Sequence, residues 1–183
     1  MSAYGCEVVV YPEDGATRDL AIALTAAKCG SVFKQDKTIT VRRPCGGKEY
    51  AVEAAIENCN LKNFPNRRII ILIDFDKCNT SLSRVKQKIP PEHAGKFYIL
   101  GWSGKIEDLK SEVRCAGAGF NKLAAKLVDD CLPHCHGVWE RDEFAQMRES
   151  AHGSKSECER LVDEILPLIL NPFQVAKKQH LSL

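Results

Sequence analysis

Acidic side chains follow the apolar stretches of this sequence at the points where strands are expected to end. Asp74 and Asp76 come directly after Ile69-Ile-Ile-Leu-Ile73, a run of five large aliphatic residues. In an extended strand, residues two apart point to the same side, which would place these carboxylates about 7 Å apart along the backbone. Two carboxylates at that spacing repel each other, so one should bind a proton unless a divalent cation lies beside them. The pair therefore predicts a cation site.

Further acids are expected at the same edge. Glu13 follows the apolar segment 6–11, and Glu107 follows the apolar segment 96–100. The carboxyl ends of parallel strands share one edge of a sheet, where ligands of open α/β sheets bind. Mg²⁺ is usually held by one or two carboxylates with water and substrate phosphate. We therefore expect these acids and the aspartate pair to hold Mg²⁺ or Mn²⁺ for phosphoryl transfer. Glu107 also has a simpler explanation, because acids at helix starts complement the helix dipole.

The alternation of short apolar segments with longer amphipathic ones predicts the elements that position these acids. This alternation is typical of βαβ units, so we expect an α/β fold with a mostly parallel central sheet of about four strands flanked by helices. After residue 115 only helical patterns follow, which predicts a core over 1–115 and a C-terminal helical extension over 116–183, packed on the core. The expected strands are 6–11, 37–43, 69–73 and 96–100, and the expected helices are 16–28, 47–57, 80–88, 106–110, 118–132 and 157–170.

Composition excludes several classes of protein. The 183 residues carry 26 Lys and Arg against 24 Asp and Glu, so a nucleic-acid partner would have to be held by a local basic patch. The helix leaving the acidic strand offers such a patch in Arg84, Lys86 and Lys88, although exposed basic residues are often only solvated surface. No apolar run is long enough to span a membrane, and the first residues lack the pattern of a secretory signal. We expect a cytoplasmic protein whose nine cysteines are mostly reduced.

The segments VVVYPEDGATRDLA, CGGKEY, IIILIDFD and FYILG together resemble the Toprim domain over about residues 5 to 115. That family includes primases, topoisomerases and small nucleases. The resemblance implies that Glu13 is a general base or metal ligand, that Asp74 and Asp76 bind Mg²⁺, and that Glu107 is a further acid of the nuclease branches. It implies a nuclease or phosphoryl transferase acting on DNA or RNA, with a protein partner that supplies ATPase or DNA-binding function.

Two other functions stay open. The segment IIILIDFDKCNT also resembles the start of haloacid-dehalogenase-like phosphatases, which implies Asp74 as nucleophile, Asp76 as acid and base, and Ser103 as a phosphate contact. Lys77-Cys78 stands where that family has Gly-Thr, which disfavours this alternative. The second alternative is that this chain is a non-catalytic Toprim-like binding or regulatory subunit.

Two smaller features complete the sequence-based hypotheses. Thiols and imidazoles gather in the segment 131–136, but neighbouring ligands point apart and a structural Zn²⁺ site normally uses two separated pairs. A helix-end loop with a buried thiol is the simpler interpretation. Trp102, beside the acidic edge, is expected either to stack on a base or to pack under the following turn. The four residues of the thiol and imidazole group are Cys131, His134, Cys135 and His136.

Overall fold

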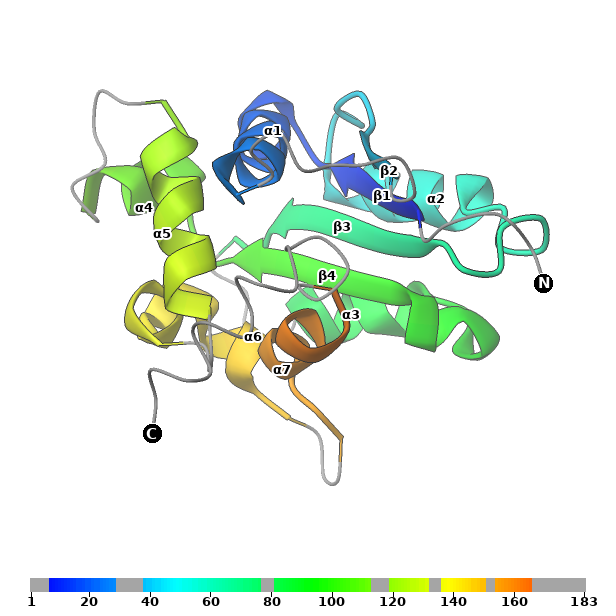
Figure 1. Ribbon diagram of the computed structural model, residues 1–183. Helices are drawn as coiled ribbons and strands as arrows, with labels where there is room; N and C mark the ends of the chain where they lie inside the picture. Colours follow the sequence, from blue (N-terminus) through cyan, green and yellow to red (C-terminus); the bar gives the residue numbers. More distant parts are fainter. Residues whose placement is uncertain are drawn as a thin grey trace.

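The computed structural model describes residues 7–28, 38–76, 81–112, 119–131, 136–150 and 154–165. Four parallel strands form one sheet in the order β2-β1-β3-β4, which confirms the expected α/β fold (Figure 1). Their β-branched and aliphatic sequences suit strands that are covered on both faces. The strands are β1 (Glu7–Pro12), β2 (Thr38–Val41), β3 (Arg68–Asp74) and β4 (Phe97–Trp102).

The register of the strands brings their carboxyl ends to one edge. Pro12 of β1 pairs with Leu72 of β3, and Asp74 of β3 pairs with Trp102 of β4. β3 lies inside the sheet, and Ile71 at its centre is fully buried. The residue after β1 and the last residue of β3 therefore meet at the same edge, as the sequence pattern predicts.

Helices cover both faces of the sheet (Figure 1). Helix α1 (Gly15–Lys28) packs against α5 (Asn121–Cys131) on one face. The other face carries α2 (Lys48–Asn58) and α3 (Ser81–Lys88), while α4 (Ile106–Glu112) follows β4. Two short helices complete the described chain, α6 (Ala145–Arg148) and α7 (Glu157–Arg160). Among the described residues, no helix combines the length and the apolar character needed to cross a membrane.

The described residues also contain three short 3₁₀ helices and one short π-helix. These are η1 (Pro91–Lys96), η2 (Gly137–Glu140), η3 (Asp142–Phe144) and η4 (Leu161–Ile165). The indole Nε1–H of Trp139 donates to the Leu127 carbonyl oxygen at 2.7 Å, and its ring contacts Phe144 with centroids 4.8 Å apart. These contacts fasten the segment after α5 to the rest of the core. The helix expected over 157–170 begins as predicted at a Ser156 capping box, and its part beyond 165 lies outside the described residues.

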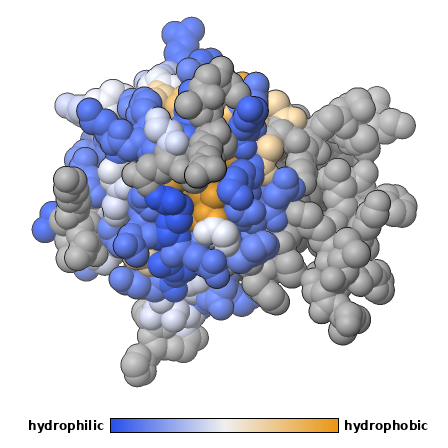
Figure 2. Space-filling view, turned by 90° about the vertical axis from the view of Figure 1, so that its left-hand side faces the viewer, coloured by the Kyte–Doolittle hydropathy of each residue, from blue (hydrophilic) through white to orange (hydrophobic). Residues whose placement is uncertain are grey.

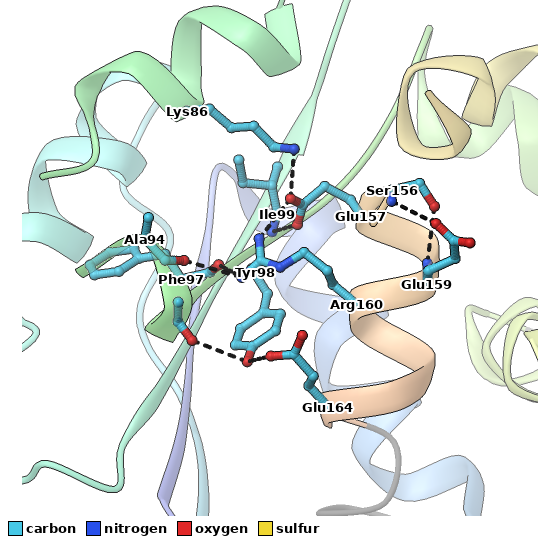
Figure 3. A network of polar contacts seen from close by, with 11 residues as sticks. Lys86, Ala94, Phe97, Tyr98, Ile99, Ser156, Glu157, Glu159, Arg160 and Glu164 are labelled. Atoms are coloured by element: carbon cyan, nitrogen blue, oxygen red, sulfur yellow. Dashed lines mark hydrogen bonds and ion pairs between the residues drawn. The ribbon is translucent and has the colours of Figure 1, made fainter. Parts of the chain in front are cut away.

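Helix α7 lies along the outer edge of β4, where its side chains take the place of a neighbouring strand (Figure 3). Glu157 accepts the Ile99 N–H at 3.2 Å, and Arg160 donates to the Phe97 carbonyl oxygen at 2.9 Å. These are backbone groups that β4 turns away from β3. Glu157 is fully buried and also pairs with Arg160 at 2.8 Å and with Lys86 of α3 at 2.8 Å. A buried carboxylate needs such partners to offset the loss of its hydration.

Candidate functional site

The residue that follows β1 reaches across to the end of β3. The backbone N–H of Glu13 donates to the Leu72 carbonyl oxygen at 2.9 Å, which continues the ladder between the two strands. Its side-chain Oε2 accepts the backbone N–H of Asp74 at 2.9 Å. The structure therefore places Glu13 and Asp74 side by side, the juxtaposition that the sequence predicts from the two strand ends.

A glycine turn supports Glu13 from the other side. The N–H groups of Gly46 and Gly47 donate to the Glu13 carbonyl oxygen at 2.9 and 3.2 Å. Both glycines have positive φ angles, 83° and 150°, which residues with a Cβ rarely adopt. The sequence Cys45-Gly-Gly therefore forms a turn that holds the Glu13 backbone and starts helix α2.

Asp74 carries the most perturbed carboxyl group of the site. Its Oδ1 is buried and forms no hydrogen bond with the residues that the structure describes. Burial raises the pKa of Asp74 from 3.8 to about 7, with further increases from the negative charges of Glu13, Asp14, Asp76 and Glu107. Burial also raises the pKa of Glu13, although the Asp74 N–H and the nearby ammonium of Lys48 oppose that rise. The carboxylates around Asp74 therefore outnumber the positive charge that Lys48 supplies to them.

Asp76 does not lie in the strand, as the i, i+2 spacing with Asp74 assumed. β3 ends at Asp74, and Asp76 lies in the following turn with a left-handed φ of 52°. Its carboxylate is 75% exposed and pairs with the ammonium of Lys48, which lies 2.6 Å away. The same ammonium donates to the Asp74 carbonyl oxygen at 3.3 Å. Lys48, at the start of α2, therefore contacts both Asp74 and Asp76.

The two remaining acids have different surroundings. Asp14 caps helix α1, because its Oδ1 accepts the Thr17 N–H at 2.8 Å while the Thr17 hydroxyl accepts the Asp14 N–H at 2.9 Å. Glu107 is exposed in the first turn of α4, where it complements the helix dipole, and its charge contributes to the raised pKa of Asp74. Within the described ranges, no group of three His, Cys, Asp or Glu side chains is arranged to hold a metal ion.

The three basic side chains predicted to form a patch on α3 lie on two different faces of the helix. Arg84 and Lys88 face α2 and line a hollow beside Asp76. Lys86 lies on another side of the helix and pairs with the buried Glu157 at 2.8 Å. Only the first two are therefore placed beside the acidic edge. The face at which the strands end is largely hydrophilic around a small hydrophobic patch (Figure 2).

Two further residues that the sequence singles out, Trp102 and Ser103, lie at and just after the carboxyl end of β4. Trp102 is 1% exposed, so its ring is buried and does not lie on the surface where it could stack on a base. The backbone N–H of Ser103 donates to the Glu143 carbonyl oxygen at 2.7 Å. The proposed thiol and imidazole group falls largely outside the described residues, because 132–135 are not among them.

Lys48 is the residue of this site that sequence reasoning missed. The sequence contains a signal that would have found it, namely a lysine directly after two glycines at a helix start. A cation in the first turn is opposed by the helix dipole, so it indicates a nearby carboxylate or anion. No protein-family model, curated protein or solved structure matches this chain, so its function is inferred from the site itself.

Proposed function

We propose that this protein is a Toprim-like, Mg²⁺- or Mn²⁺-dependent nuclease or phosphoryl transferase that acts on nucleic acid. The observation that carries the proposal is the state of Asp74. Its Oδ1 is buried without a hydrogen-bond partner among the described residues, and carboxylates surround it. A divalent cation would give Asp74 Oδ1 a partner and would reduce the repulsion between the carboxylates.

The donor set suits Mg²⁺ more than a metal that requires an all-protein cage. Mg²⁺ prefers oxygen ligands and is commonly held by one or two carboxylates together with water and substrate phosphate. Asp74 and Glu13 would supply these carboxylates, and Asp76 would join them by exchanging its ion pair with Lys48 for the metal. Glu107, on the neighbouring helix, is a candidate for a contact through water. The bound ion would neutralise charge on the phosphate and activate the attacking water or hydroxyl.

The protein's own residues would then have separate tasks. Glu13 combines a raised pKa with a position beside Asp74, which suits a group that accepts a proton from the attacking water. Its backbone is fixed by Leu72 and by the glycine turn, so the carboxylate needs little rearrangement. We further propose a cytoplasmic location and a partner protein that supplies ATPase or DNA-binding function.

The test is cleavage of mixed DNA and RNA in the presence of Mg²⁺ or Mn²⁺, with p-nitrophenyl phosphate as a second substrate. Asp74→Ala should abolish cleavage. Asp19→Ala removes an exposed aspartate of α1 and is the matched control, which should cleave as the wild type does. Turnover of p-nitrophenyl phosphate alone would indicate a phosphatase and contradict the proposal.

The ion pair between Lys48 and Asp76 favours a second candidate, a non-catalytic Toprim-like binding or regulatory subunit. An ammonium 2.6 Å from a carboxylate already supplies part of the positive charge that a metal would bring. Binding of nucleic acid without cleavage under any divalent cation would support this second function.

A further inference from the structure

A hollow beside the acidic edge contains more positive than negative side chains. It lies where the start of α2, the turn after β3 and one face of α3 come together. Among the residues that the structure describes, its charged lining consists of three cations and two carboxylates, a net charge of +1. The charged residues are Lys48 and Glu49 from α2, Asp76 from the turn, and Arg84 and Lys88 from α3.

The spacing along α3 produces this arrangement. Ser81, Arg84, Val85 and Lys88 recur at the three- and four-residue intervals that place side chains on one helical face, and all four line the hollow. Val85 and Ser81 are buried at its base. Lys86 falls on another face and is engaged by Glu157. Helix α3 therefore directs two of its three cations into the hollow.

The cations of the hollow keep unused hydrogen-bond donors. Lys48 contacts the Asp76 carboxylate and the Asp74 carbonyl oxygen, which uses two of the three donors of its ammonium. Lys88 pairs with Glu49. Arg84 is exposed and forms no hydrogen bond or ion pair with the residues that the structure describes. Its planar guanidinium matches the oxygens of a phosphate and is always charged.

We propose that this hollow binds a phosphate group, with Arg84 and Lys88 as its principal contacts and Lys48 shared between the phosphate and Asp76. The net charge of +1 on the described lining complements the single negative charge of a phosphodiester. The inference rests on the proposed function for the molecule that carries the phosphate, a nucleic-acid strand. The hollow would hold a backbone phosphate adjacent to Asp76 while the acids act on its neighbour.

The experiment measures binding without catalysis. A short fluorescent oligonucleotide is titrated with protein in EDTA at low salt and followed by anisotropy, with inorganic phosphate as competitor. The same sequence with an uncharged methylphosphonate backbone distinguishes phosphate recognition from contacts to bases. The variants are Arg84→Gln and Lys88→Gln, and Lys62→Gln is the matched control, an exposed lysine in the connection to the opposite end of β3.

We expect Arg84→Gln and Lys88→Gln each to weaken binding by about tenfold, because a charge-assisted hydrogen bond is lost. Lys62→Gln should change affinity by less than about twofold, since it loses the same charge at a distant site. Inorganic phosphate should compete, and the uncharged oligonucleotide should not bind.

Three results would overturn the phosphate site: equal weakening by all three variants, failure of phosphate to compete, or no binding by the wild type. Binding that behaves as expected in EDTA, without cleavage when metal is added, would leave this inference standing and refute the proposed nuclease.

Discussion

Replacing Asp74 with asparagine should stabilise the protein at alkaline pH while abolishing its response to Mg²⁺. The carboxyl group has a pKa of about 7 in the folded chain and an ordinary value of 3.8. The folded state therefore binds this proton more tightly than the unfolded state does. Raising the pH from about 4 to about 7 then lowers the free energy of unfolding, and the full loss is present above pH 7. Asparagine remains neutral throughout, so the variant escapes this loss.

The size of the effect follows from the two pKa values. Each pKa unit corresponds to about 1.4 kcal/mol, so the upper limit is about 4 kcal/mol. Because the carboxyl group is only partly buried, we expect about 2 to 4 kcal/mol after allowing for solvent screening. For a chain of this size, the melting temperature at pH 8 should then rise by about 5 to 15 °C relative to the wild type. At pH 5 the two proteins should differ much less.

The assay is urea or thermal unfolding of both proteins at several pH values between 5 and 8, with and without Mg²⁺. Mg²⁺ should raise the melting temperature of the wild type at pH 8, because a ligand that binds only the folded state stabilises it. It should not do so for Asp74→Asn. Asp19→Asn is the control for loss of an exposed carboxylate. If the difference between wild type and Asp74→Asn is the same at pH 5 and pH 8, the reasoning about burial and carboxylate repulsion is refuted.

Three further substitutions test other parts of the structure. Glu157→Gln should lower the free energy of unfolding by about 3 kcal/mol, because Lys86 and Arg160 lose the charge of the fully buried carboxylate that pairs with both; an unchanged urea midpoint would contradict this. Gly101→Ala should lower the free energy of unfolding by at least about 2 kcal/mol in the same assay, because the added Cβ would clash with the Phe75 ring. Its control is Gly95→Ala, where the added Cβ meets open space and the free energy of unfolding should hardly change. Lys48→Met should tighten Mg²⁺ binding by up to about fivefold in calorimetry, because the ammonium no longer competes for its carboxylate; weaker binding would argue against that competition.

The strands and the longer helices were predictable because burial imposes periodicity on their residues. Ile69–Ile73 has aliphatic side chains on both faces, and only a central strand buries such a run in so short a length. The predicted meeting of Glu13 and Asp74 followed from topology alone, since parallel strands share one carboxyl edge. The capping box at Ser156 was likewise visible in local sequence. Short turns such as η2 and η3 have no period and left no comparable pattern.

Side-chain partners were harder to predict than elements. The i, i+2 rule applies only while a strand continues, and β3 ends at Asp74, so Asp76 adopts a turn conformation instead. Lys86 and Lys88 look equivalent in the sequence, but one pairs with a carboxylate from α7 that lies far along the chain. Such partners depend on packing between distant segments, which residue patterns in one segment do not encode.

The side chains that α7 lays along β4 also determine how this protein can associate with others. An open strand edge invites pairing with another chain, through unsatisfied N–H and carbonyl groups. On β4 the Ile99 N–H and the Phe97 carbonyl are already engaged by Glu157 and Arg160. Any partner that extends this sheet by adding a strand must therefore approach the opposite edge, β2, or first displace α7.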